Sequence, residues 1–390
     1  MRPTAIVTGM IATYPVGGVV WDYAQYALGL ERLGWDVYYL EDTGWQTYDP
    51  DTGQYGEDPA YGVAFLGRSL AALSPALGRR WHVVGMDGRT YGLPAPEFAA
   101  AVRAADLFLN VSGGTLLRDA YMACPCKVLV DTDPGYNHFV NFPKWDANPN
   151  WHGSHGYRAH DHFLTYAERI GRPDCPLPTF GLPWQPTRPP VVTDAWQGHD
   201  RAVGERWTTV MTWDNFRKPI EHAGVTYGTK EREFGKVEGL PRRLGRGVRL
   251  EVASGGDPPV ERWRSLGWSV IDAHAASRTA DAYRDYVCRS RGEFSVAKNV
   301  YVATGCGWFS CRTVCYLAAG RPAVVQDTGF SEIIPTGRGL FAFDDVEQAA
   351  AAVRAVEADY PAHSAAARAV AAEHFAADRV IGDLLRRVRP

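Results

Sequence analysis

The sequence predicts an α/β protein made of two doubly wound, Rossmann-like domains that face each other across a cleft. Nearly continuous apolar strands alternate with helices in both halves of the chain, and a proline-dense segment separates the halves. Strands that are apolar throughout are typical of parallel sheets covered by helices on both faces. At 390 residues the chain is long enough to give each domain a full core.

The first half of the chain predicts one complete α/β domain. Its expected strands are 5–12, 36–40, 81–85, 107–111 and 127–130, and its expected helices are 20–33, 62–73, 96–105 and 116–123. The segment 173–190, PDCPLPTFGLPWQPTRPP, then breaks the alternation. Because proline lacks the backbone N–H, this segment can neither continue a helix nor pair as a central strand, and it predicts an interdomain linker. We therefore expect a first domain at residues 1–185.

Strand and helix alternation resumes after the linker and predicts a second domain at residues 186–370. The expected strands are 208–212, 249–253, 269–271, 293–297 and 323–325, and the clearest helices are 310–319, 346–357 and 363–385. We expect residues 371–390 to form a closing helix that packs back towards the first domain. Since open α/β sheets bind ligands at the carboxyl ends of their strands, the site is expected in the cleft between the domains.

Composition excludes several classes of partner. The chain has 41 basic and 44 acidic residues and a net charge of −3, so no overall field attracts nucleic acid, and no nucleic-acid partner is expected. No apolar run is long enough to span a bilayer, so no membrane span is expected. Seven cysteines, an odd number in a long chain, predict a reducing cytoplasmic location rather than a disulfide framework.

A glycine-rich loop in the second half carries the clearest functional signal. Gly305 and Gly307 lie in TGCGW, and Ser310 follows as a good N-cap for a helix that has Arg312 in its first turn. Free N–H groups and the positive end of a helix dipole suit a phosphate, and arginine adds a permanent cation. A second loop, with Thr328 and Gly329, follows the next strand. The alternative is an ordinary crossover whose glycines only make turns.

The same part of the chain resembles a known family. The pieces GWFSCR, CYLAAGRPAVVQDTGF and GRGLFAF within 292–343, with the tail 359–385, are similar to the C-terminal donor domain of bacterial GT-B glycosyltransferases. The resemblance covers about the last third of the chain, and the first half matches only in layout. It implies the GT-B fold, a nucleotide-diphosphate sugar as co-substrate, no further cofactor, no required metal and retention at the anomeric carbon.

One departure from the family pattern concerns the nucleotide. Many retaining members carry two glutamates spaced E-x7-E, and the corresponding positions here hold Gly307 and Cys315. In the larger family the second glutamate commonly binds the ribose, so the contacts to ribose and base are left open. Glu332 lies near a position where the family often carries a glutamate, and we include it among the donor-binding candidates.

The resemblance also implies cations that neutralise the leaving diphosphate. The candidates are Arg312, Lys298, Arg217 and Lys230, each of which has a solvated surface cation as its alternative. Lys298 is the strongest because it ends an apolar strand at the expected cleft, and we predict it to be catalytic. Charge placed where negative charge develops is usually the largest single contribution to catalysis.

Acidic residues after a strand of the first domain predict the acceptor side of the reaction. Asp131 and Asp133, in VDTDPG, follow the strand 127–130. One of the two is expected to accept the acceptor's proton or to stabilise an oxocarbenium-like centre. The alternative is a capped turn, which these residue types also fit. His138, in the same loop, is a further acceptor-side candidate.

Two other segments complete the acceptor-side hypotheses. Gly17 and Gly18 would let substrates approach the backbone closely, although the pair also resembles half of a dinucleotide fingerprint. His155 lies in the histidine-rich run WHGSHGYRAHDH, 151–162, which we interpret as an acceptor-binding or lid segment rather than as a metal site. The sequence thus predicts a glycosyltransferase acting on a small-molecule or glycan acceptor. A catalytically silent GT-B protein and an NAD-dependent oxidoreductase are the alternatives.

Overall fold

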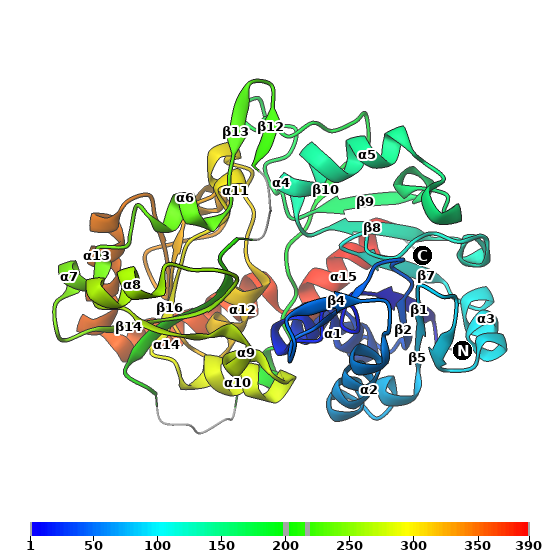
Figure 1. The fold of residues 1–390 in the computed structure, drawn as a ribbon, viewed down its shortest axis with the longest axis horizontal. Helices are drawn as coiled ribbons and strands as arrows, with labels where there is room; N and C mark the ends of the chain where they lie inside the picture. Colours follow the sequence, from blue (N-terminus) through cyan, green and yellow to red (C-terminus); the bar gives the residue numbers. More distant parts are fainter. Residues whose placement is uncertain (1, 198–202, 215–218, 389–390) are drawn as a thin grey trace.

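The protein is described by a computed structural model that covers residues 2–197, 203–214 and 219–388. Two lobes lie side by side, each built on its own sheet, as Figure 1 shows. The strands of one sheet lie between residues 4 and 186, and those of the other between residues 206 and 343. Within the described ranges, no helix has both the length and the apolar character needed to cross a membrane.

The first sheet has eight strands in the order β10-β9-β8-β7-β1-β2-β5-β6. Neighbouring strands are parallel except for β5 and β6. The strands are β1 (Thr4–Thr8), β2 (Asp36–Glu41), β5 (Trp81–Val84), β6 (Thr90–Gly92), β7 (Leu107–Val111), β8 (Lys127–Asp131), β9 (His162–Thr165) and β10 (Gln185–Pro186). The helices of this lobe are α1 (Gly17–Arg32), α2 (Ala60–Leu73), α3 (Ala95–Arg103), α4 (Pro134–Tyr136) and α5 (Phe142–Ala147), and β3 (Thr47–Asp49) pairs with β4 (Gln54–Gly56) in a hairpin.

The second sheet is parallel throughout, with six strands in the order β15-β14-β11-β16-β17-β18. They are β11 (Arg206–Thr212), β14 (Arg249–Gly255), β15 (Ser269–Asp272), β16 (Gly292–Ser295), β17 (Ala323–Gln326) and β18 (Leu340–Phe343). The helices that follow them include α6 (Lys230–Phe234), α7 (Leu240–Leu244), α8 (Val260–Leu266), α9 (Ala273–Ser277), α10 (Ala280–Arg289), α11 (Asn299–Thr304), α12 (Cys311–Ala318) and α13 (Val346–Ala358). A separate hairpin joins β12 (Ile220–His222) to β13 (Val225–Tyr227).

The strand order of each sheet fixes where a ligand crevice lies. In the first sheet β2 and β7 flank β1, and in the second β14 and β16 flank β11, so the chain reverses direction beside the first strand of each. Ligands of doubly wound sheets bind outside the carboxyl ends of the strands at such a reversal. The loops after β7 and after β16 are therefore the natural places for substrate contacts.

Several element predictions differ from the structure. The predicted helix 116–123 is only a short 3₁₀ helix over Asp119–Ala123, and β9, β10 and α11 lie where no element was predicted. The predicted last helix 363–385 is two helices, α14 (Tyr360–Val370) and α15 (Ala377–Val388). The break has a tertiary cause. Val191 N donates to Phe375 O at 2.7 Å, and Val191 O accepts from Ala377 N at 2.9 Å.

Helix α1 lies at the centre of the molecule and contacts elements from the far end of the chain. The indole Nε1 of Trp21 donates to Ala280 O, at the start of α10, at 2.9 Å. On α15, Ala377 and Ile381 lie against Gly29 so closely that a Cβ at Gly29 would come within 2.4 Å of the Ile381 side chain. Figure 1 shows α15 beside α1, so the final helix returns to the first lobe.

Candidate active site

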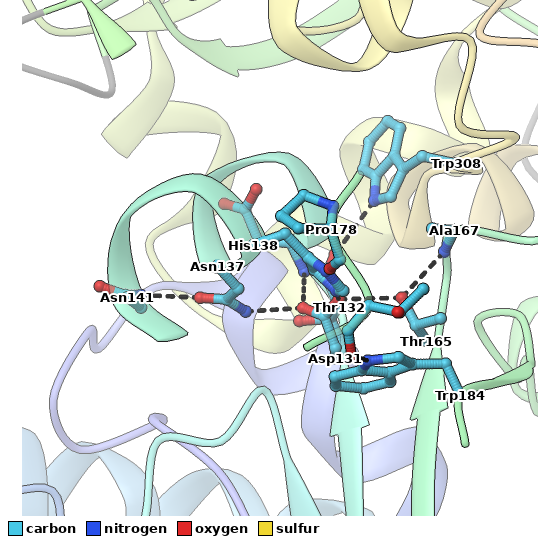
Figure 2. Close-up of polar contacts among 12 residues, drawn as sticks. Asp131, Thr132, Asn137, His138, Asn141, Thr165, Ala167, Pro178, Trp184 and Trp308 are labelled. Atoms are coloured by element: carbon cyan, nitrogen blue, oxygen red, sulfur yellow. Dashed lines mark hydrogen bonds and ion pairs between the residues drawn. The ribbon is translucent and has the colours of Figure 1, made fainter. Parts of the chain in front are cut away.

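A buried carboxylate organises the loop that follows β8. Asp131 is fully buried and accepts hydrogen bonds from Asn137 Nδ2 at 2.6 Å and Thr165 Oγ1 at 2.8 Å. Its other neighbour is His138 Nε2 at 3.1 Å, and Figure 2 shows these three side chains converging on the carboxylate. Because all of these partners belong to the interior, Asp131 holds the loop in shape and does not face solvent.

The imidazole of His138 is enclosed with Asp131. Its Nδ1 lies 2.7 Å from Pro178 O, its Nε2 faces the Asp131 carboxyl, and its side chain is 0% exposed. Both ring nitrogens therefore face oxygen atoms of the interior. The rings of Phe142 and Trp184 lie 5.0 and 4.9 Å away. The buried imidazole of His138 therefore cannot contact a substrate directly in this conformation, as its predicted acceptor-side role would require.

Asp133 is the accessible carboxylate of the same loop, with its side chain 32% exposed. Its Oδ2 lies 2.5 Å from Lys298 Nζ, and its Oδ1 accepts from the hydroxyl of Tyr301. Lys298 lies three residues beyond the end of β16, and Asp133 lies two residues beyond the end of β8, so the contact joins the carboxyl ends of the two sheets. Two of the residues predicted to be catalytic thus lie in direct contact, although 165 positions separate them.

Two aromatic residues from the second lobe hold this loop in place. Tyr301, on α11, stacks on Trp308 with ring centroids 4.2 Å apart and an interplanar angle of 18°. Trp308 Nε1 donates to Thr132 O at 3.0 Å, a bond drawn in Figure 2. Neither aromatic residue was predicted as a site residue. Both lie in or beside the TGCGW loop, so aromatic rings flanking a glycine-rich loop were the available signal.

Cations gather beside this contact in the second lobe. Burial, with Arg312 and Lys298 nearby, lowers the pKa of Lys230 well below its ordinary value. Lys230 opens α6 and has no hydrogen-bond or ion-pair partner within the described ranges. The nearby carboxylate of Glu293 opposes this shift only in part. An ammonium group beside two other cations is unfavourable in the free protein, and an anionic ligand would relieve the remaining repulsion.

Arg312 is anchored within the second lobe. Its guanidinium donates to Glu293 Oε1 at 2.6 Å, Val210 O at 2.9 Å and Ser295 Oγ at 2.8 Å. Ser310 caps α12 as predicted, since its Oγ accepts from Arg312 N at 3.2 Å. Ser310 and Arg312 line a cavity of about 20 Å³ at the start of this helix, room for about one water molecule. A contact between Arg312 and a phosphate stays a prediction. In the structure the Arg312 side chain also links β11 and β16 through these hydrogen bonds.

The predicted phosphate loops are occupied by an arginine from the first lobe. Arg169 Nη1 donates to Gly305 O at 2.9 Å, and a Cβ at Gly307 or Gly329 would lie 3.0 or 2.6 Å from the Arg169 side chain. The amide groups of Gly305, Gly307 and Gly329 donate to protein oxygens at 2.7–3.1 Å, those of Val302, Thr328 and Asp327. These glycines are thus explained by the close approach of Arg169, and their contact with a diphosphate stays a prediction.

Glu332 and Thr328 belong to the same contact between the lobes. Glu332 pairs with Arg169 at 3.2 Å and with Arg172 at 3.0 Å. Thr328 Oγ1 donates to the backbone oxygen of Trp308 at 2.5 Å. This bond links the second glycine loop to the residue whose ring stacks on Tyr301. Sequence reasoning missed Arg169, because nothing in its local sequence indicates that it reaches a loop 136 residues later.

Gly17 and Gly18 also serve contact between the lobes. A Cβ at Gly17 would lie 2.1 Å from Thr279 O, and Gly18 N donates to Ser277 Oγ at 3.0 Å. The group that approaches the backbone of these glycines closely is therefore the segment of Ser277 and Thr279 in the second lobe, where a substrate was predicted. His155 pairs with Asp119 at 2.6 Å on the exposed surface, and the structure does not bring it to Asp133. The predicted donor contact of Arg217 lies outside the described residues.

A short loop after β7 was missed in the sequence. Ser112 adopts a left-handed backbone with φ of 63°, and Gly113 and Gly114 follow it. Ser112 Oγ lies 2.7 Å from Thr132 Oγ1 and accepts from Tyr23 OH at 3.1 Å. The loop thus lies beside the Asp133 loop at the reversal point of the first sheet. Two glycines directly after a buried strand were the signal for it.

No protein-family model matches the sequence, and no curated protein sequence matches it. Similar solved structures exist, including two of an alpha-glucosyltransferase in complex with UDP and a 13-mer DNA containing an HMU base. Their TM-scores are 0.56 and 0.57 at 8% identity, with all of both chains covered. AviGT4, a glycosyltransferase involved in avilamycin A biosynthesis, has a TM-score of 0.48 at 13% identity and covers 100% of this chain and 97% of its own. The likeness confirms the predicted architecture: the protein has the GT-B fold of nucleotide-sugar glycosyltransferases.

Proposed function

We propose that the protein transfers a sugar from a nucleotide-diphosphate sugar to an acceptor held by the first domain. One observation carries this proposal. The accessible carboxylate of Asp133, at the end of a first-sheet strand, meets Lys298 and its neighbouring cations at the ends of the second-sheet strands. In a GT-B fold, this juxtaposition supports a reaction centre with a negative group on the acceptor side and positive groups on the donor side.

The donor diphosphate is assigned to Lys230 and Lys298. Lys230 forms no direct ion pair with the residues described, and Glu293 only partly offsets the repulsion from its cationic neighbours. The ammonium groups of Lys230 and Lys298 are close enough for one to affect the pKa of the other. A diphosphate offers the charge that this cluster lacks, and its own charge increases as the bond to the sugar breaks. These cations supply the stabilisation that a metal ion supplies in other enzymes, so we propose transfer without a required metal or cofactor.

The proposed reaction breaks one bond and forms one bond at the anomeric carbon. The bond from C1 to the diphosphate oxygen breaks, and its electron pair leaves with the diphosphate. The acceptor oxygen bonds to C1, and its proton passes to the departing phosphate oxygen. Asp133 stabilises the positive charge on the sugar in the transition state. We propose retention of configuration, as the resemblance implies, and the anomeric coupling constant of the product in proton NMR tests it; inversion would instead assign Asp133 as the base.

The acceptor is assigned to the crevice formed by the loops after β7 and β8, near Ser112, Thr132 and Asp133. We propose a small molecule or glycan as the acceptor. One structural neighbour was solved with DNA, so the assay should include a duplex DNA acceptor, for which we expect no transfer. A cytoplasmic location is part of the same proposal and is supported by the seven cysteines, which all lie in the described part of the chain and form no disulfide bond there.

A thermal-shift and hydrolysis assay tests the proposed function. We expect UDP, GDP or dTDP to raise the melting temperature, since a ligand at 100 times its Kd stabilises the folded state by about 2.7 kcal/mol. The matching nucleotide sugar should then be hydrolysed slowly in the absence of an acceptor. Binding without hydrolysis or transfer would favour a silent GT-B protein. A shift with NAD alone would favour an oxidoreductase.

Replacement of Lys230 should separate stability from binding. A lysine whose pKa is lowered on folding binds a proton more readily in the unfolded chain, so below its ordinary pKa it reduces the stability of the free protein. We therefore expect Lys230→Met to raise the melting temperature of the free protein near neutral pH and to weaken nucleoside-diphosphate binding by about tenfold.

Calorimetry supplies the measurement and the control for this prediction. Titrations in buffers of different ionisation enthalpy should show proton uptake when the diphosphate binds, and Lys230→Met should reduce that uptake. Lys236, which is mostly exposed and pairs with Glu233 at 2.8 Å, provides the matched control, and Lys236→Met should leave binding unchanged. Equal affinity in the Lys230→Met variant and the wild type would remove Lys230 from the donor site.

A further inference from the structure

We propose that Lys298 exchanges partners during the reaction cycle. In the free protein it neutralises Asp133, and when the donor binds it moves to the diphosphate, which makes the charge of Asp133 available to the reacting sugar. The inference rests on the proposed function and adds regulation to the same site: the donor itself switches on the acceptor-side carboxylate.

In the free protein Asp133 is not ready to act. Its Oδ2 lies 2.5 Å from Lys298 Nζ, and its Oδ1 accepts from the Tyr301 hydroxyl. A carboxylate with both oxygens occupied and its charge neutralised gives little stabilisation to a developing positive charge on a sugar. For Asp133 to serve the reaction, one of these two partners has to leave.

Lys298 is the partner that can leave. It precedes α11 as its N-cap residue, directly beyond β16 at the reversal point of the second sheet, where a ligand of that domain is expected. Its ammonium group is close enough to Lys230 to lower the pKa of that residue, so the same group lies beside the proposed diphosphate position. A lysine carries a compact charge on a flexible stem, so it can change partners without moving the backbone.

Tyr301 is the partner that stays. Its side chain is 1% exposed and stacks on Trp308, which is itself bonded to Thr132 O next to Asp133. Burial beside Asp133 raises the pKa of Tyr301, so its hydroxyl remains a donor. We therefore assign Tyr301 as a positioning residue, which keeps Asp133 Oδ1 oriented after Oδ2 is released.

Crystal structures of the free protein and of its UDP complex test the exchange directly. In the free protein, Lys298 Nζ should lie on Asp133 Oδ2. In the complex it should lie about 3 Å from a diphosphate oxygen and beyond hydrogen-bond distance of Asp133. A complex in which UDP is bound and Lys298 remains on Asp133 would overturn the exchange while leaving the proposed function intact. Failure of all nucleoside diphosphates to bind would overturn the proposed function itself.

Affinity measurements test the exchange in solution. If UDP has to displace Asp133 from Lys298, Asp133→Asn should bind UDP and inorganic pyrophosphate about fivefold more tightly. This factor corresponds to the free energy of the partly exposed ion pair that the ligand no longer has to break. Asp36 is a matched control, because its side chain is 34% exposed and pairs with Arg80 at 2.8 Å at the opposite end of the first sheet. Asp36→Asn should leave both affinities unchanged. Unchanged or weaker binding by Asp133→Asn would contradict the exchange.

Tyr301→Phe tests the positioning role separately. The variant keeps the ring and its stacking on Trp308 and loses only the hydroxyl that donates to Asp133. We expect unchanged UDP affinity, about tenfold lower kcat, and an acid limb of the kcat profile shifted to higher pH, because the carboxylate loses a donor that favours its ionised form. A fall in kcat with no shift of the acid limb would show a merely structural role.

Discussion

Lys298→Met should lower the turnover of the enzyme about a hundredfold, or 2.7 kcal/mol, the usual effect of removing one preorganised charge-stabilising donor. In the free protein this lysine pairs with Asp133. Donor binding therefore gains only the difference between the free energy of its contact with the diphosphate and that of its contact with Asp133. In the transition state the diphosphate carries more negative charge, and the same ammonium contributes more. Donor affinity should therefore fall by only about tenfold, because interactions that strengthen in the transition state act mainly on kcat.

Steady-state kinetics and calorimetry with the same nucleotide sugar measure the two effects independently. Lys298→Arg keeps the positive charge and should recover part of the turnover, although the planar guanidinium does not replace a compact ammonium. Lys236→Met again serves as the control for the loss of a lysine. The idea is falsified if Lys298→Met lowers affinity and turnover by the same factor, since the cleft would then only bind the nucleotide sugar.

The sequence predicted the fold well because its signals are local. Strand 107–111 was predicted with the bounds that β7 has, since a mostly apolar run ends there at Ser112 and two glycines. The break between α14 and α15 could not be predicted, because it depends on hydrogen bonds from Val191, which lies 185 residues before Ala376. Short β9 and β10 were missed for a similar reason: β9 is a strand because it pairs with β8, and β10 because it pairs with β9.

The site was predicted in part. Asp133 and Lys298 were singled out because each follows a strand, and parallel sheets gather such residues at one end. The structure brings the two side chains into contact, and their catalytic roles stay predictions. The sequence left both aspartates as candidates, since the burial of Asp131 depends on Thr165 from another strand. It also assigned Gly307 and Gly329 to a phosphate. In the structure these glycines accommodate Arg169, and the phosphate contact stays a prediction. A glycine in a loop indicates that another group approaches the backbone closely, but it does not indicate whether that group is a ligand or a side chain of the same protein.

The difference between the two aspartates leads to the second large effect. Asp131→Ala should lower the free energy of unfolding by about 3–5 kcal/mol, because a buried charge network loses one of its members. The side chains of Asn137, His138 and Thr165 would each lose their acceptor in the interior. Asp133→Ala should lower the free energy by less, about 1–2 kcal/mol, since its side chain is 32% exposed and, of its two partners, the buried Tyr301 hydroxyl loses its acceptor.

Urea unfolding and transfer assays on the two variants separate the roles. Asp131→Ala should show the stability loss together with whatever activity the folded fraction retains, while Asp133→Ala should remain folded and lose transfer to the acceptor. His138→Phe provides an independent check, because it removes another member of the buried network without touching Asp133, and it too should destabilise the protein. If Asp131→Ala unfolded at the wild-type urea concentration, the carboxylate would not be supporting the fold. The buried network drawn in Figure 2 would then have to be read as part of the reaction centre.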